Sequence, residues 1–266
     1  MKNPFIYSLL FCYVLAACNS SQNSTDTNSE NAIAAPNALS YELIKVYPHD
    51  TSSYTQGLEW NGHKLIEGTG LEGKSILQIL DTNMNLVGSK VKLDKEFFGE
   101  GTTLFKDKIY QLTWQNHKVF VYDANTFKKE KEFNWNYEGW GITHYNNQLI
   151  ISTGSSNLYF VNPTTLAIEK TLGVYDNNGY IASLNELEMI DGKIYANVWG
   201  DNKIIVINPT SGQVEKQFDF TDILQKSNQP ITTETNVLNG IAYDSISKAA
   251  YITGKNWPAI FKVSLQ

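Results

Sequence analysis

A strand–turn–strand pattern recurs along this chain, and it constrains the fold more than any other feature of the sequence. Each copy runs through an apolar strand, turns at polar residues and returns as a second strand. The copies begin at Gly57, Gly101, Gly141, Glu186 and Gly240. Successive starts lie 44, 40, 45 and 54 residues apart. Repeats of about 40–50 residues built from short strands are typical of β-propeller blades, so we expect five blades.

A third strand follows each copy, and a fourth follows the first four. The third strands are apolar runs that mostly end at Asp or Asn, whose side chains close tight turns. The fourth strands are more polar, for instance residues 128–133 and 213–220, as expected of an outer edge. The fifth copy ends at Gln266 without a fourth strand, and residues 41–47 are predicted to supply it. The predicted fold is an all-β, five-bladed propeller over residues 40–266, closed by the N-terminal strand.

Composition agrees with one all-β domain and argues against nucleic-acid binding. Six Trp, fifteen Tyr and twelve Phe, together with many β-branched runs, favour strands over helices. The chain has a formal net charge of −6 and contains no arginine. No basic patch for nucleic acid or for an acidic membrane surface is therefore expected.

The N-terminal region is predicted to lie outside the propeller. An apolar run over residues 4–17 is too short to span a bilayer and is typical of an export signal. It ends in Leu-Ala-Ala-Cys, which resembles a bacterial lipobox, although an ordinary cleavage site is the alternative. We expect residues 1–18 to be a lipoprotein signal peptide, Cys18 to be acylated, and residues 19–39 to be a flexible tether rich in Ser, Asn and Thr. The predicted location is the bacterial cell envelope, on the periplasmic side or the cell surface.

The repeat argues against two nucleotide-binding patterns and against a metal site made of histidines. Residues 68–75 (GTGLEGKS) match both a phosphate loop and a dinucleotide fingerprint, but both sites need a helix after the glycines, where the repeat places a strand. The histidines occupy unrelated repeat positions without partners at a ligand spacing, so they are predicted to lie on the surface or in turns: His49, His63, His117 and His144. We expect no catalytic metal, while a structural ion elsewhere stays open.

Positions that depart from the repeat predict the functional site. Inner strands line the axis of a propeller, and the residues just before the five repeat starts are Gln56, Glu100, Trp140, Asn185 and Asn239. Each second strand returns to the same face, where it ends at Gly70, Trp114, Gly154, Trp199 or Lys255. Indoles, amides and a single carboxylate describe a small pocket with convergent polar groups, although indoles that merely plug the channel are the alternative. Burial is expected to raise the pKa of Glu100 and Lys255 to lower it.

Motifs in collinear order from about residue 41 to residue 266 resemble the plant and bacterial glutaminyl-peptide cyclotransferases. They are YTQGL (54–58), EGTG (67–70), FGEG (98–101), GWG (139–141), LNELE (184–188), ANVW (196–199), LNGIA (238–242) and TGKNWP (253–258). The resemblance implies a five-bladed propeller that converts N-terminal glutamine of peptides to pyroglutamate with loss of ammonia, without a catalytic metal or other cofactor. One departure is Gly68, where we expect the family to carry Ser.

The resemblance also implies roles for individual residues. Glu100 is the acid/base carboxylate, and the substrate pocket consists of Gln56, Trp114, Trp140, Asn185, Trp199 and Lys255. Phe98, Asn239 and Glu67 lie in the same motifs and complete the predicted substrate-binding set. In the implied reaction the α-amine attacks its own γ-carboxamide, Glu100 moves the proton, and Gln56, Asn185 and Lys255 orient the amide and stabilise the oxyanion.

Two other functional classes stay open at this point. One is a non-catalytic propeller that binds a partner. The other is a propeller hydrolase or lactonase, for which an inner ring with one carboxylate is a poor metal site. Glu67, Glu186 and Glu188 are rival carboxylates to Glu100, and Glu67 is interpreted as a residue that fixes a loop beside the pocket. We expect a monomer that acts on peptides with N-terminal Gln and touches the membrane only through its lipid.

Overall fold

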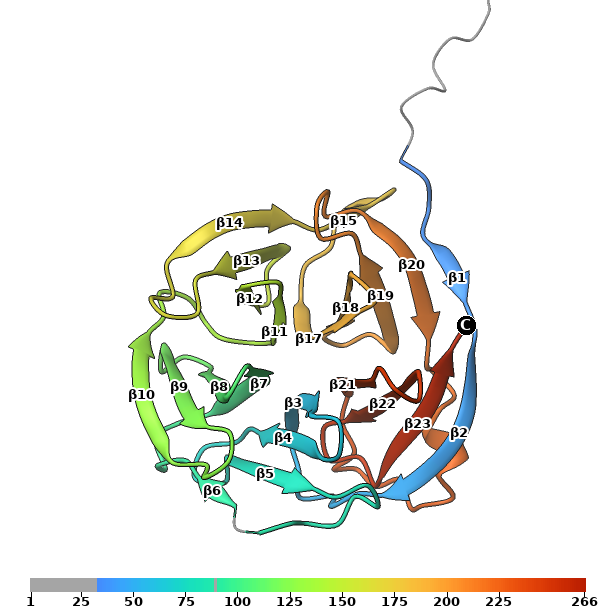
Figure 1. Ribbon diagram of the computed structural model, residues 1–266. Coiled ribbons are helices and arrows are strands. Elements are labelled where there is room, and N and C mark those ends of the chain that lie inside the picture. Colours follow the sequence, from blue (N-terminus) through green and yellow to red (C-terminus); the bar gives the residue numbers. More distant parts are fainter. Residues whose placement is uncertain (1–32, 89) are drawn as a thin grey trace, which may run out of the picture. The chain divides into compact units, whose positions relative to one another are not determined.

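The computed structural model describes residues 33–88 and 90–266. These residues form a ring of five antiparallel sheets around a common axis (Figure 1). The predicted all-β, five-bladed propeller is thereby confirmed. In this part of the chain the only helical element is a short 3-10 helix, η1 (Leu224–Ser227). No helix within it is long and apolar enough to cross a membrane.

Each blade is a meander in which chain neighbours pair antiparallel from the axis to the rim. Blade 1 comprises β3 (Thr55–Trp60), β4 (Leu65–Thr69), β5 (Ile76–Leu80) and β6 (Val91–Lys92). Blade 2 comprises β7 (Gly99–Phe105), β8 (Lys108–Thr113), β9 (Lys118–Asp123) and β10 (Lys129–Asn134). Blade 3 comprises β11 (Ile142–Tyr145), β12 (Gln148–Ser152), β13 (Asn157–Val161) and β14 (Ile168–Gly173).

The last two blades include the N-terminal strands. Blade 4 comprises β17 (Leu184–Ile190), β18 (Lys193–Val198), β19 (Lys203–Ile207) and β20 (Val214–Asp219), with β1 (Asn37–Leu39) beyond its rim. Blade 5 comprises β21 (Leu238–Asp244), β22 (Ala249–Gly254), β23 (Ala259–Leu265) and, as its outer strand, β2 (Tyr41–Pro48). A small hairpin, β15 (Tyr175–Asp176) and β16 (Gly179–Tyr180), lies between blades 3 and 4 in the sequence.

The core consists of five apolar clusters, one between each pair of neighbouring blades. Successive side chains of a strand point to opposite faces of its sheet, so one strand feeds two clusters. Leu65 packs in the cluster shared with blade 5, whereas Ile66, the next residue, packs in the cluster shared with blade 2. Strands of a propeller are therefore buried on both faces, which explains why they read as nearly continuous apolar runs.

Glycines at the repeat starts let neighbouring inner strands touch backbone to backbone. A Cβ atom on Gly101 would lie 2.7 Å from the carbonyl oxygen of Trp140, and one on Gly141 would overlap the carbonyl of Asn185. Because a side chain at either position would force two blades apart, the repeat begins with glycine wherever the strands meet in this way.

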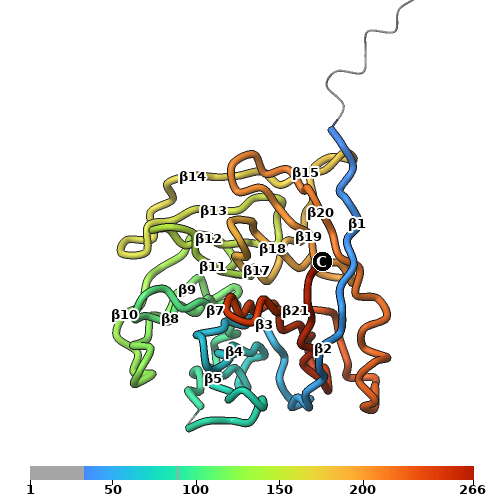
Figure 2. Tube along the Cα trace, turned by 45° about the vertical axis from the view of Figure 1, so that its right-hand side comes forward, coloured from blue at the N-terminus to red at the C-terminus, as the bar shows by residue number. Residues whose placement is uncertain are grey.

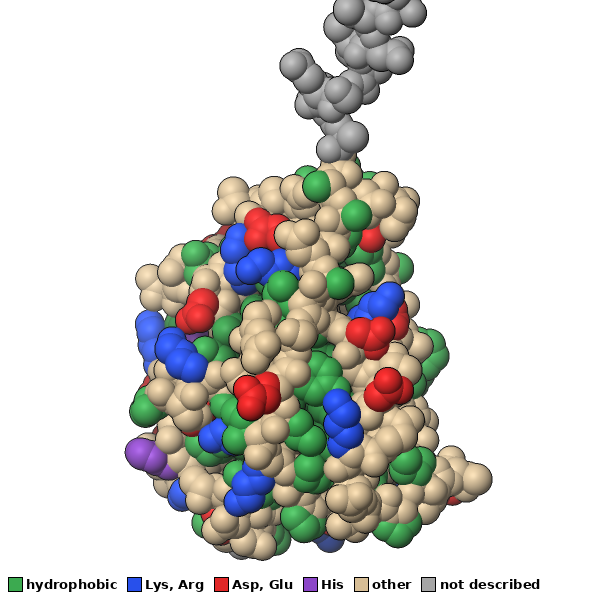
Figure 3. Space-filling view, turned by 90° about the vertical axis from the view of Figure 1, so that its right-hand side faces the viewer, with side chains coloured by type: hydrophobic (Ala, Val, Ile, Leu, Met, Phe, Trp, Pro, Cys, Tyr) green, Lys and Arg blue, Asp and Glu red, His purple; other side chains and the backbone are tan. Residues whose placement is uncertain are grey.

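Two consecutive N-terminal strands bind the ring across blades 4 and 5. Strand β2 pairs with β23, which confirms the predicted closing strand. Strand β1 pairs in parallel with β20, and Leu39 packs against the cluster between the two blades. Figure 2 shows β1 and β2 as one continuous strap along the rim. Over this part of the rim, charged side chains of both signs are scattered rather than gathered (Figure 3).

The predicted boundary of the tether is wrong at its C-terminal end. Residues 37–39 were expected to belong to the tether, but they form β1. Three residues carry too little apolar periodicity to be recognised, since their order comes from the free edge of β20. The predicted signal peptide, the predicted lipidation at Cys18 and the predicted tether residues 19–32 lie outside the described residues.

Stepwise N-terminal deletion tests the strap. Deleting residues 19–36 should leave the melting temperature unchanged. Deleting residues 19–40 removes β1 and should lower it by about 2–4 °C, the effect of about 1 kcal/mol in a domain of this size. Deleting residues 19–48 should yield aggregated protein, because the edge of β23 becomes exposed. Thermal melts of protein expressed without the signal peptide measure all three, and a soluble form lacking residues 19–48 with an unchanged melt would contradict the role of β2.

Candidate active site

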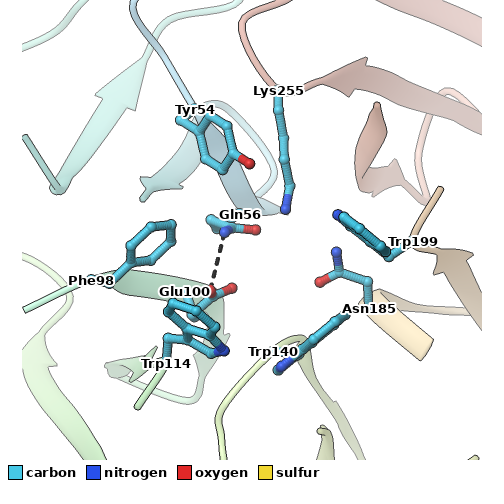
Figure 4. Close-up of a pocket in the computed structure, with 9 residues that line it drawn as sticks. All are labelled: Tyr54, Gln56, Phe98, Glu100, Trp114, Trp140, Asn185, Trp199 and Lys255. Atoms are coloured by element: carbon cyan, nitrogen blue, oxygen red, sulfur yellow. Dashed lines mark hydrogen bonds between the residues drawn. The ribbon is translucent and has the colours of Figure 1, made fainter. Parts of the chain in front are cut away.

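A cavity of about 320 Å³ opens on the face of the ring where the inner strands begin. Side chains from all five blades line it (Figure 4), and they are Tyr54, Gln56, Phe98, Glu100, Trp114, Trp140, Asn185, Trp199 and Lys255. Eight of these nine belong to the predicted site. Tyr54 was not predicted as a lining residue, while the predicted Asn239 and Glu67 lie outside the cavity wall. The indole rings of Trp114, Trp140 and Trp199 line this open space.

β-Bulges in the inner strands aim the polar residues at the cavity. In four blades the register between the inner strand and the second strand shifts by one residue. The shifts fall at or around Gln56, Glu100, Asn185 and Asn239. The extra residue of a bulge leaves the ladder and turns its side chain. In these four blades the residue before the repeat start therefore lies in the bulge, and this explains why the site departs from the repeat at those positions.

In three blades the residue directly after the second strand lines the same cavity, and these residues are Trp114, Trp199 and Lys255. The backbone N–H of Trp114 donates to Phe98 O at 3.0 Å, and that of Lys255 donates to Val237 O at 2.9 Å. Where sister blades carry glycine instead, the space is filled by an aromatic ring of the site. A Cβ atom on Gly154 would lie 2.6 Å from the indole of Trp140. The glycines of this ring of positions thus make room for the cavity wall.

Glu100 is a buried carboxyl, and its surroundings shift its pKa in opposite directions. Its side chain is only 5% exposed, and its Oε1 atom accepts a hydrogen bond of 3.1 Å from Gln56 Nε2. Burial raises the pKa of Glu100 well above its ordinary value, Lys255 opposes this rise, and Glu138 adds to it. Burial likewise lowers the pKa of Lys255 to about 8, against the pull of Glu100. A carboxyl group in this setting can exchange a proton much closer to neutral pH than an exposed one.

The amide side chains take two different roles. Asn239 lies behind Gln56, donating from Nδ2 to Thr55 O at 3.0 Å and to Gln56 Oε1 at 3.4 Å. It therefore turns the Gln56 N–H toward Glu100 and does not touch the cavity, contrary to its predicted role in substrate binding. Asn185 lines the cavity, and its Oδ1 atom has no hydrogen-bond partner among the described residues. A buried acceptor of this kind is available to an N–H group of a ligand.

Glu67 was predicted to bind substrate, but it belongs to a buried ion pair behind the wall. Its Oε1 atom lies 3.0 Å from His49 Nε2 and accepts from Thr55 Oγ1 at 2.7 Å, while Gln78 Nε2 donates to Oε2 at 2.7 Å. The other ring nitrogen of His49 lies 3.0 Å from Trp257 O. The His49 side chain is 2% exposed, so the predicted surface or turn position is wrong for this histidine.

The charge state of His49 and Glu67 depends on their attraction for each other, which outweighs the cost of burying the two charges. Burial alone would lower the pKa of His49, but the Glu67 carboxylate raises it overall. Burial alone would raise the pKa of Glu67, but His49, Thr55 and Gln78 lower it overall. The pair is therefore charged near neutrality. It links the residue after β2 to Thr55, the neighbour of Gln56 in the site.

Glu138 is the site residue that sequence reasoning missed most clearly. Its Oε2 atom accepts hydrogen bonds from Trp114 Nε1 at 2.8 Å and from Trp140 Nε1 at 3.1 Å. Its Oε1 atom accepts from Gln115 Nε2 at 3.0 Å. No repeat position marks Glu138, and the available signal was an acidic residue two positions before a ring Trp.

The rival carboxylates are buried in the ring away from the cavity wall. Glu186 accepts hydrogen bonds from the backbone N–H groups of Leu58 at 3.2 Å and Ile241 at 2.9 Å, and Glu188 accepts from Tyr243 N at 2.9 Å. Burial raises the pKa of both carboxyls well above the ordinary value. These glutamates bridge inner strands of different blades, so their role is structural.

Two further observations concern the metal-binding and phosphate-binding patterns of the sequence. Within residues 33–88 and 90–266, no group of three or more His, Cys, Asp or Glu side chains is placed to hold a metal ion. After the glycines of residues 68–75 comes β5, and no helix follows them. The phosphate-binding patterns therefore lack the helix N-terminus that they require.

Comparison with known proteins agrees with this geometry. A family model described as glutamine cyclotransferase matches residues 10–265. The chain is 34% identical to the glutaminyl-peptide cyclotransferase of Arabidopsis thaliana over 227 residues, which cover 85% of this chain and 71% of that protein. The chain belongs to the glutamine cyclotransferase family. The crystal structure of Myxococcus xanthus glutaminyl cyclase superposes with a TM-score of 0.78 at 31% identity, covering 87% of this chain and 98% of that one. For this glutamine cyclotransferase, the resemblance inferred from its motifs is confirmed.

The buried pair of the cyclotransferase gives a test with a defined pH window. Glu67→Gln leaves His49 buried without a counter-charge, which should cost about 3–5 kcal/mol of unfolding free energy. Because the pKa of His49 is raised in the folded protein, the stabilisation from its positive charge is fully present below about pH 6.5. This stabilisation is lost as the pH rises through the pKa that His49 has in the folded state. Because the pKa of Glu67 is lowered in the folded protein, the stabilisation from its negative charge is present above about pH 4.5. This stabilisation is lost as the pH falls through the pKa that Glu67 has in the folded state.

The difference in melting temperature between wild type and Glu67→Gln should therefore be largest between about pH 4.5 and 6.5. Thermal melts across pH 3–9 measure it, with the exposed Glu72→Gln as the matched control. A difference that does not vary with pH would show that the two side chains are not a charged pair.

Proposed function

We propose that this member of the glutamine cyclotransferase family is a glutaminyl-peptide cyclotransferase, which converts the N-terminal glutamine of a peptide to pyroglutamate and releases ammonia. The observation that carries the proposal is the buried carboxyl of Glu100, which faces an aromatic cavity of about 320 Å³ together with a lysine of lowered pKa. A group with a perturbed pKa in such a cavity suits proton transfer better than passive binding.

The reaction needs one proton to be moved and one oxyanion to be stabilised. The α-amine attacks the carbonyl carbon of its own γ-carboxamide, the C–N bond to the amide nitrogen breaks, and ammonia leaves. An α-amino group has a pKa of about 7.7–8.0, so only modest help is needed to remove its proton. Glu100 accepts that proton and returns it to the departing nitrogen, which leaves the carboxylate unchanged over the cycle.

Lys255 stabilises the oxyanion that forms on the substrate, and Asn185 binds the substrate amide. Figure 4 shows the Lys255 ammonium and the Asn185 amide pointing into the same space, across the cavity from the Phe98 ring. Lys255 supplies positive charge for the developing oxyanion, and the unpartnered Oδ1 atom of Asn185 accepts from a substrate N–H. Gln56 donates to Glu100, so its role is to orient the carboxyl rather than the substrate amide.

The indoles supply the shape that ring closure requires. Trp140 and Trp199 meet edge to face with ring centroids 6.5 Å apart, and Phe98 meets Trp114 in the same way at 5.6 Å. Ring closure is already intramolecular, so confining the glutamine side chain to a folded rotamer lowers the remaining entropic barrier.

We further propose that catalysis needs no metal and that one chain suffices. The cavity lining offers one carboxylate and no histidine, a donor set that neither zinc nor calcium prefers. The five blades of one ring together supply the wall of the cavity, and the proposal of a monomer rests on this.

Glu100→Gln is the direct test of the proposed chemistry. Glutamine keeps the shape and the hydrogen bond from Gln56 but cannot carry the proton, so kcat should fall by roughly 10²- to 10⁴-fold. The melting temperature should not fall, since the removed charge is buried and costly. Ammonia release from a Gln-initiated dipeptide measures activity, with and without EDTA, and Glu72→Gln is the control. Wild-type protein without activity would refute the function, near-normal turnover by Glu100→Gln would refute the assignment, and loss of activity with EDTA in folded protein would refute metal independence.

The cell-envelope location is also proposed, on the sequence of residues 15–18. Cys18 would carry a lipid after cleavage of the signal peptide, and the chain up to residue 36 would hold the propeller at a distance from the membrane. Growth of expressing bacteria with a labelled fatty acid should mark the wild-type protein and leave Cys18→Ala unmarked. Equal labelling of the two proteins would contradict the lipid anchor.

A further inference from the structure

Three indole nitrogens from two blades converge on one residue that the reaction scheme does not use. Trp114 and Trp140 both donate to Glu138 Oε2, at 2.8 Å and 3.1 Å, and Trp135 Nε1 donates to the backbone oxygen of Glu138 at 3.4 Å. In Figure 4 the nitrogen atoms of Trp114 and Trp140 turn toward the space between the two rings. One carboxylate oxygen thus fixes the angle between two walls of the cavity.

A neutral side chain of the same size cannot reproduce this arrangement together with its charge. An indole N–H is only a donor, so two indoles that share a partner require an oxygen with two free lone pairs. In Glu138 the second oxygen is also engaged, by Gln115 Nε2 at 3.0 Å. A glutamine here would have to turn its own N–H groups toward one of these donors. Hydrogen bonds to an ionised acceptor are also roughly twice as strong as neutral ones.

The charge of Glu138 is maintained by the same hydrogen bonds. Burial alone would raise its pKa, but Trp140, Gln115, Trp114 and His117 together lower it. Glu138 therefore places a permanent negative charge behind the indoles, on the side of the cavity that holds Glu100.

We propose that Glu138 is a positioning residue of this site, which holds the indoles of Trp114 and Trp140 in register and supplies a fixed negative charge next to Glu100. The proposal rests on the proposed cyclisation, because its catalytic consequences act through Glu100 and the indole walls. It assigns a role to a side chain that does not line the cavity.

The two parts of the proposal have separable consequences. The charged and titratable groups that face Glu100 are Lys255, Tyr54 and Glu138, and His117 faces Glu138 in turn. Of these, Lys255 lowers the pKa of Glu100 and Glu138 raises it. Loss of the Glu138 charge should move the acid limb of the pH profile of kcat/KM to lower pH. Loss of the indole contacts should lower kcat/KM at every pH.

Two substitutions distinguish these effects in the full protein. Glu138→Gln removes the charge, leaves only neutral hydrogen bonds to the indoles and turns N–H groups toward one of the present donors, so kcat/KM for a Gln-initiated dipeptide should fall about tenfold or more and its acid limb should shift down. Glu138→Asp keeps the charge on a shorter side chain that cannot reach both indoles, so kcat/KM should fall while the acid limb stays in place. The exposed Glu72→Gln should change neither. An acid limb that is unmoved in Glu138→Gln would overturn the electrostatic part of the proposal.

An observation independent of activity tests the positioning part. In protein labelled with ¹⁵N at the indoles, the N–H resonances of Trp114 and Trp140 should move in Glu138→Gln, whereas that of Trp257, which donates to Asn236 O, should not. Unchanged resonances of Trp114 and Trp140 would overturn the positioning role. If wild-type protein released no ammonia, the proposed function would fail, while these resonances would still decide whether Glu138 holds the indoles.

Discussion

The close approach of the inner strands at the axis is the constraint on which the rest of the structure depends. Where Gly101 and Gly141 lie against the backbone of the next blade, no side chain can point along that contact. In four of the five blades the inner strand carries one extra residue near this contact, and the extra residue turns its side chain out of the ladder. The bulges that accompany packing at the axis are thus also the features that point Glu100 and Asn185 into the cavity.

Buried charge is handled in three ways within one small domain. His49 and Glu67 lie 3.0 Å apart and neutralise each other, which gives a rigid charged pair. Glu186 and Glu188 have no cationic partner among the groups that set their pKa values, so burial favours their neutral forms. Burial raises the pKa of Glu100, while Lys255 lowers it and Glu138 raises it, so charged neighbours of both signs act on this carboxyl. Only the third arrangement is suited to a proton that must both arrive and leave.

The fold and most of the cavity wall could be predicted because a repeat defines equivalent positions. Once Gly57 and Gly101 are equivalent, Gln56 and Glu100 must face the same space, as must the ends of the second strands. What could not be predicted depends on bonds between segments that the repeat does not relate. His49 and Glu67 meet only because β2 closes the ring, and Glu138 is defined by two indoles from different blades. Strand β1 is ordered by an edge that lies far away in the sequence.

Closure of the ring and assembly of the site are linked through the chain that follows the strap. Strand β2 ends at Pro48, and the next residue, His49, pairs with Glu67 and touches the carbonyl oxygen of Trp257. Glu67 in turn accepts from Thr55, whose neighbour Gln56 donates to Glu100. The closing strand therefore does more than cover an edge, because it positions His49, which is connected to the proposed catalytic carboxyl through hydrogen bonds and the peptide bond between Thr55 and Gln56. Since the cavity takes side chains from all five blades, it exists only when that ring is closed.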